Sequence, residues 1–181
     1  NSSNITYSSV KITWDTNRLG NSVVRYGTTI PPTNIVSDFS WLTSHSIKLF
    51  NLLSKTTYYF EIESASTDGY TIIDNNGGRY YSFNTENSPP NVPREPNPDD
   101  GEEKIKITAI LRWIGGDEDG DDVLYDVYLW EENSPIKKVS ENQSAEFYDP
   151  VPDLKPITKY YWQIIAKDAQ GASTAGPIWY F

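Results

Sequence analysis

The chain has 181 residues and a formal net charge of −10 at pH 7, and residues 89–181 carry most of it, with 18 acidic against 9 basic side chains. A field of this sign repels phosphate backbones, so we expect no nucleic-acid partner and favour cations or basic partners instead. The lack of cysteine excludes disulfides and thiolate-based zinc sites, and no apolar run reaches the ~18 residues that cross a bilayer, so we expect no membrane insertion.

Short segments of alternating polarity in the first half predict β-strands joined by turns. Residues 9–15 alternate apolar and polar side chains, and residues 22–27 form a second strand after a turn at residues 19–21. Residues 45–49 alternate again. His45 is the only histidine of the chain, and with no Cys or carboxylate cluster beside it we assign it to the surface.

One stretch of the sequence occurs twice. Residues 52–64 and residues 154–166 align at a constant offset of 102, and each has a leucine, a polar turn and then a tyrosine that begins a strand of strict alternation. The tyrosine of such a corner, Tyr58 or Tyr160, can bury its ring and hydrogen-bond its hydroxyl to the backbone a few residues upstream. This is the tyrosine-corner arrangement of β-sandwiches.

A proline-rich segment separates the two copies. Residues 87–98 hold five prolines, which favours an extended, polyproline-like conformation. Because an internal repeat of this length indicates repeated domains, we predict one domain over residues 1–88 and a second over residues 89–181, with the proline-rich segment as its first strand.

The second half shows stronger alternation. Residues 105–113, including Ile107, and residues 125–129 place alternate side chains inward, which leaves Asp126 outside. The remaining elements are residues 136–139, residues 145–148, the second corner and a final strand with Trp179 and Phe181 inward. No segment has a helical period. We therefore predict an all-β fold of two consecutive seven-stranded immunoglobulin-like β-sandwiches.

These features resemble a tandem pair of fibronectin type III domains. The resemblance rests on Trp14 and Trp113 and on the Leu, Thr and Tyr of the two corners. Residues 24–28 are also similar to the noncatalytic amino-terminal domain of purple acid phosphatases, and the second copy to domains of microbial cell-surface and secreted enzymes. The resemblance implies adhesion, spacing or accessory binding, and no catalysis by the module itself.

The acidic loop that begins at Asp117 is the candidate metal site. Asp117, Asp119 and Asp121 stand at alternate positions around a glycine, and carboxylate oxygens are the ligands that Ca²⁺ prefers. The EF-hand pattern is incomplete. A solvated acidic turn is therefore the alternative to a Ca²⁺ site, and we expect no other cofactor.

A candidate interaction face follows from the alternation of two strands in the second half. Tyr128 and Trp130 point outward, and Tyr161 and Ile165 share that face if the strands pair as they usually do in this fold. Exposed aromatic rings in a row stack on sugars or anchor a protein partner. The alternative is that a neighbouring domain covers them.

Asn4 and Asn142 begin N-glycosylation triplets, as does the terminal Asn1. Such triplets favour an extracellular or cell-surface location. We also expect the chain to be a piece of a longer polypeptide, whose other domains would then be its first partners.

Two functions remain open at this stage. The first is a non-catalytic spacer and interaction module of a larger cell-surface or secreted protein, which mediates adhesion or protein–protein contact. The second is an accessory domain pair of a secreted hydrolase, which contacts carbohydrate or supports folding. We do not expect an enzyme, because the acidic residues fall on loops and outer faces and not across a cleft.

Overall fold

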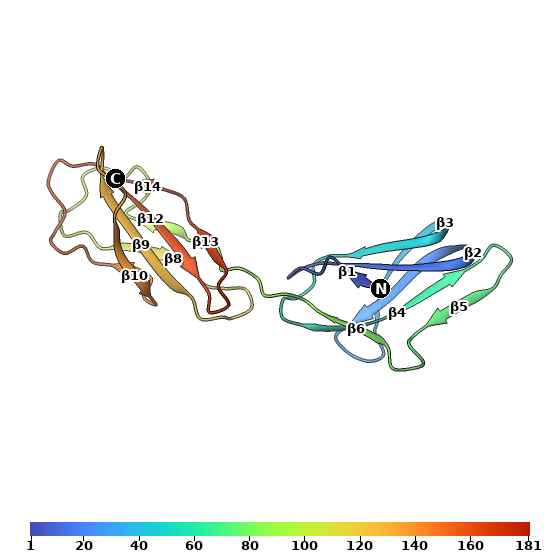
Figure 1. The fold of residues 1–181 in the computed structure, drawn as a ribbon. Helices are drawn as coiled ribbons and strands as arrows, with labels where there is room; N and C mark the ends of the chain where they lie inside the picture. The colour runs from blue at the N-terminus through green and yellow to red at the C-terminus, as the bar shows by residue number, and fades with distance from the viewer. The chain divides into compact units, whose positions relative to one another are not determined.

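The computed structural model describes all residues from Asn1 to Phe181. The chain forms strands and no helices, and it divides into two compact units, Asn1–Ser88 and Pro89–Phe181 (Figure 1). The predicted all-β sandwich class is confirmed, although the first unit has six strands and not the predicted seven. No helix is present that has the length and apolarity to cross a membrane.

The first unit is a six-stranded antiparallel sheet folded around one core. The ladder runs β1-β2-β4-β5, while β3 pairs with β2 and β6 pairs with β4. Its strands are β1 (Ser2–Ser3), β2 (Val10–Gly27), β3 (Asn34–Leu49), β4 (Thr57–Ala65), β5 (Thr71–Asp74) and β6 (Tyr81–Asn84).

The long strand β2 corrects the prediction of two strands separated by a turn at residues 19–21. Its first part pairs with the end of β3 up to Asp15, and its second part, from Ser22 onward, pairs with the beginning of β3. The register shifts on each side of Gly20, which also bridges to Ser66. These contacts keep the backbone extended through a bend, so β2 contributes to both halves of the core.

His45 lies in this core, and its assignment to the surface was wrong. Its side chain is 1% exposed. The ring nitrogens share hydrogen bonds with the hydroxyls of Ser22 (2.8 Å) and Thr16 (2.9 Å). Along β3, His45 stands two and four residues before the buried Ile47 and Leu49, so the period of the strand directs it inward.

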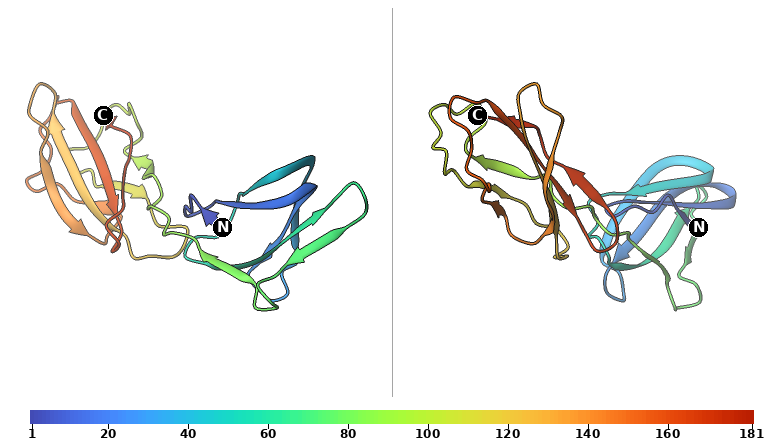
Figure 2. Two further views of the ribbon diagram at one scale, coloured as in Figure 1. Left: turned by 45° about the vertical axis from the view of Figure 1, so that its right-hand side comes forward. Right: turned by 60° about the vertical axis from the view of Figure 1, so that its left-hand side comes forward.

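The second unit consists of two sheets (Figure 2). The five-stranded sheet has the order β10-β9-β12-β13, with β14 also on β12, and the three-stranded sheet has the order β11-β8-β7. Because β13 and β14 pair with successive parts of β12, they act as one interrupted strand. The strands are β7 (Arg94–Asn97), β8 (Leu111–Ile114), β9 (Leu124–Glu131), β10 (Lys138–Gln143), β11 (Phe147–Tyr148), β12 (Tyr160–Lys167), β13 (Ser173–Ala175) and β14 (Trp179–Tyr180).

Alternation along β9 and β12 builds the core of the second unit, as predicted. Tyr125, Val127 and Leu129 are buried on β9. On β12 the side chains of Trp162 and Ile164 are fully buried, whereas the residues that alternate with them, Tyr161, Gln163 and Ile165, are half-buried. The core is completed by Leu111, Trp113, Leu154, Tyr160, Ala166 and Trp179.

The segment before β8 departs from the predicted strand over residues 105–113, because only Leu111–Ile114 pairs. The amide of Ala109 donates to the Lys106 carbonyl (3.0 Å), which closes a turn. The Ile107 carbonyl accepts from the Leu154 amide (2.9 Å). Ile107 itself is 45% exposed, so its predicted inward position was wrong.

The two corners have the same hydrogen bond. The Tyr58 hydroxyl oxygen accepts from the amide of Leu53 (2.9 Å), and the Tyr160 hydroxyl oxygen accepts from the amide of Lys155 (3.0 Å). Both tyrosines are buried. The predicted tyrosine corner is therefore confirmed in both copies, and it fixes the start of β4 and of β12.

Each corner turn also contains a residue in the left-handed region at the same place, Lys55 (φ 48°) and Ile157 (φ 54°). The threonine that follows donates its hydroxyl to a carbonyl two residues back, from Thr56 at 2.6 Å and from Thr158 at 3.0 Å. The repeat thus extends to backbone conformation.

Candidate functional site

Three aromatic rings lie side by side on the outer face of the five-stranded sheet. Trp130 on β9 and Tyr180 on β14 both stand opposite Tyr161 on β12. The Tyr161 ring centroid is 5.9 Å from that of Trp130 and 6.0 Å from that of Tyr180. Since residues paired across a ladder share a face, the alternation that buries Trp162 directs all three rings outward. We call Trp130, Tyr161 and Tyr180 the outer aromatic row.

A lysine lies against one end of this row. The Nζ of Lys159 is 4.9 Å from the Tyr161 ring centroid and 4.3 Å from that of Tyr180, distances at which cation–π attraction operates. A hydrogen bond with Tyr161 raises the pKa of Lys159. Glu132 accepts from the Tyr161 hydroxyl (3.3 Å) and lies 3.8 Å from Lys159, so charged groups border the row.

The other residues predicted for this face lie farther along the same strands. Tyr128 stands opposite Gln163, and Ile165 stands opposite Asp126. The ladder therefore brings Tyr128, Trp130, Tyr161 and Ile165 together on one face. Sequence reasoning missed Tyr180, although the inward assignment of its two neighbours already implied that its side chain points outward.

Asp126 lies on the outer face as predicted, opposite Ile165, but it is buried there, with 4% of its surface exposed. Lys167 and Lys138 donate to its two carboxylate oxygens at 2.6 and 2.8 Å, and the Asn142 amide donates at 3.0 Å. Burial alone would raise the pKa of Asp126, but these hydrogen bonds outweigh it and lower the pKa to about 2. The lysines cover this end of the face. At the aromatic end Tyr180 is 41% exposed, and Trp130 and Tyr161 are half-buried.

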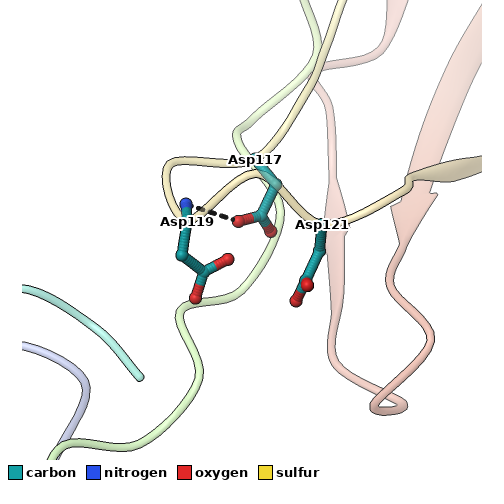
Figure 3. A group of neighbouring side chains, drawn as sticks. All are labelled: Asp117, Asp119 and Asp121. Carbon is teal, nitrogen blue, oxygen red and sulfur yellow. Dashed lines mark hydrogen bonds between the residues drawn. The ribbon is translucent and has the colours of Figure 1, made fainter. Parts of the chain in front are cut away.

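The acidic loop brings the three predicted carboxylates together. One carboxylate oxygen from each of Asp117, Asp119 and Asp121 lies within 4.8 Å of the others (Figure 3). The amide of Asp119 donates to Oδ1 of Asp117 (2.9 Å). Burial, a hydrogen bond with Asp119 and the charges of Asp119 and Asp121 raise the pKa of Asp117. The group has the donor chemistry for a hard cation, and calcium binding stays a prediction.

The two glycosylation candidates are exposed. Asn4 and Asn142 both have exposed side chains and left-handed backbone conformations, with φ of 49° and 52°. The asparagine amides are therefore accessible to a modifying enzyme. Whether they carry glycans stays a prediction.

No known family model matches this sequence, and none of the curated proteins does. Among solved structures, the chain is similar to the FN1–FN3 domains of chicken CNTN1, with 18% sequence identity and a TM-score of 0.48. The match covers 98% of this chain and 62% of that one. The likeness to purple acid phosphatases remains a resemblance of residues 24–28.

Proposed function

We propose that this chain is a non-catalytic interaction module of a larger extracellular or cell-surface protein, and that the outer aromatic row contacts a protein partner. The observation that carries the proposal is the row itself, with Lys159 packed over two of its rings. Trp and Tyr are enriched at the energetic centre of protein–protein interfaces, which charged groups border as a polar rim.

The surroundings of the row support a protein partner. Lys159 and Glu132 lie 3.8 Å apart beside Tyr161. An exposed ion pair of this kind contributes little to stability, but it belongs to the polar rim that surrounds an apolar binding centre. The exposed Asn4 and Asn142 support the extracellular or cell-surface location.

A second candidate function is an accessory domain that contacts polysaccharide. It is favoured by the linear order of the three rings across neighbouring strands, because successive rings can stack on successive sugars. The two functions use the same face and differ in the chemistry of the ligand.

The test is binding of the purified chain to a panel of immobilised extracellular protein domains and to a panel of polysaccharides. Trp130→Ala and Tyr161→Ala should abolish binding to at least one member of the protein panel. The matched control is Phe147→Ala, because Phe147 is 47% exposed and lies on β11 of the other sheet. Circular dichroism checks that each variant is folded.

Each outcome has one meaning. Loss of polysaccharide binding alone in the Trp130 and Tyr161 variants would establish the accessory function and reject the protein-contact function. Binding that survives in both variants, or that Phe147→Ala removes equally, would reject the outer aromatic row as the binding site.

A further inference from the structure

A cavity of about 550 Å³ opens at one end of the core of the first unit. Three segments line it: the bend of β2 at residues 14–20, the end of β4, and β5 with the turn before it. The cavity lies where β2 and β3 lose their register between Asp15 and Gly20. The bend therefore opens the sandwich at this end.

The floor consists of side chains on the inner face of β4 and β5, some of which stay exposed. In the β4–β5 ladder, Ser64 stands opposite Ile72 and Ile62 stands opposite Asp74, so these four residues share a face. Ile62 packs against the core, which makes this the inner face. Ile72 is nevertheless 66% exposed. An apolar side chain on the inner face thus lines an open space.

Trp14 is one of two aromatic residues in the lining, with Tyr70, and its ring is fixed in place. The indole Nε1 donates to the hydroxyl of Ser64 (3.0 Å). The imidazole of His45 stacks on the indole with centroids 4.9 Å apart, and His45 is itself held by Ser22 and Thr16. Since the polar atom of the indole already has a partner, the ring offers carbon surface to the cavity. A ligand that stacks there meets a preorganised ring.

The rim supplies hydrogen-bond donors and acceptors in planar side chains. Asp15, Asn17 and Asp74 border the cavity together with Arg18. Arg18 is neutralised by Asp68 at 2.7 Å and lies over the ring of Tyr70 at 5.1 Å. The remaining charge of the rim is negative, which disfavours anions. Hydroxyl groups, which both donate and accept, match a mixed rim of carboxylate, amide and guanidinium groups.

We propose that this cavity binds a neutral sugar of one or two rings, with the apolar face of a ring on Trp14 and its hydroxyls on the rim. The volume lies within the roughly 300–1,000 Å³ of small-molecule sites. The site is in the first unit and shares no residue with the outer aromatic row, so the proposal does not depend on the function proposed above.

The experiment is a titration of the isotope-labelled chain with free glucose, galactose, mannose and xylose and their β-linked disaccharides. The chain has six tryptophans, and the indole N–H signal of Trp14 is assigned with Trp14→Phe. At least one sugar should shift that signal and the amides of the residues that line the cavity. Signals of the second unit should not move.

Two exposed lining residues provide variants that keep the core intact. Tyr70→Ala removes an aromatic side chain from the lining, and Asp15→Ala removes a hydrogen-bond acceptor from the rim. Each substitution should raise the dissociation constant for the sugar by about fivefold or more. The control is Ile73→Ala. Ile73 is 52% exposed and neighbours Ile72, but as the next residue of β5 it points to the opposite face.

The proposal is overturned if no sugar shifts the Trp14 signal, or if both cavity variants bind as the unaltered chain does. Shifts confined to the indole of Trp130 would also overturn it, and they would support the accessory function of the outer aromatic row instead. If tetramethylammonium binds in the cavity and none of the sugars does, the negative rim selects a cation and the proposal of a sugar site is rejected.

Discussion

The imidazole of His45 and the indole of Trp14 lie with their planes 11° apart and their centroids 4.9 Å apart. Burial lowers the pKa of His45, and the charge of Asp15 opposes this shift only in part. The pKa of histidine in an unfolded chain is about 6.5, so as the pH falls below that value the unfolded chain binds a proton before the folded chain does. The contribution of neutral His45 to the free energy of unfolding of the first unit is therefore complete above about pH 6.5. It is lost progressively as the pH falls below that value.

His45→Phe tests this dependence, because it keeps a ring against Trp14 and removes the titration. Urea unfolding between about pH 7.5 and 5.5 should show a steeper loss of stability for the unaltered chain than for the variant. The variant should be the less stable of the two at the upper pH, since the buried hydroxyl of Ser22 loses its partner. Equal slopes would show that the titration of His45 is not coupled to folding.

The corner hydrogen bonds should contribute equally in the two units. Tyr58→Phe and Tyr160→Phe each leave one backbone amide without its acceptor, at an expected cost of about 1 to 2 kcal/mol. The two costs should add in the double variant, because the residues belong to separate units. Calorimetry measures both transitions. A change in the same transition for both single variants would contradict the assignment of one corner to each unit.

Asp126 should make the second unit sensitive to strong acid. Its folded pKa of about 2 lies below the ordinary 3.8, so its contribution is present above about pH 4 and is lost as the pH falls towards 2. The difference amounts to about 2 kcal/mol. Asp126→Asn should lower the free energy of unfolding by about that amount at pH 7 and by much less near pH 2. A cost that is the same at both pH values would mean that packing, and not charge, explains it.

Calcium should raise the melting temperature of the second unit, and a chelator should reverse the shift. Asp119→Asn should remove this response. Without calcium the same variant should be at least as stable as the unaltered chain, because Asp117 then loses a repelling neighbour. Glu118→Gln is the control with the same change of charge, since Glu118 is exposed and outside the carboxylate group. If calcium does not change the melting temperature of the unaltered chain, the loop is a solvated acidic turn and not a calcium site.

Period-two alternation accounts for what the sequence could show. It placed the inward residues of β9 and β12, and the repeat located both corners to the residue. The same alternation also indicated the orientations of two further side chains, which the sequence analysis missed. His45 is in phase with Ile47 and Leu49, and Tyr180 lies between two inward residues, so both orientations were available from the spacing alone.

Other features depend on contacts between segments far apart in the chain. Leu19-Gly20-Asn21 has the composition of a turn, but pairing with Leu42 and Ser66 holds Gly20 in a strand. Ile107 is in phase with buried neighbours, yet its carbonyl is bound by Leu154 beyond a local turn. The cavity beside Trp14 is formed where β2 and β3 lose their register and β4 and β5 come close. These segments are far apart in the chain, so no local sequence pattern indicates the cavity.

The continuity of β2 also bears on how the first unit opens. Its residues before Asp15 and after Ser22 pair with opposite ends of β3. Because both parts belong to one continuous strand, we expect that opening of β2 and β3 at one end also disrupts their pairing at the other. Amide hydrogen exchange in the two ends should therefore occur in one cooperative event with a common free energy. The second unit, whose two sheets share no strand, can exchange its smaller sheet first.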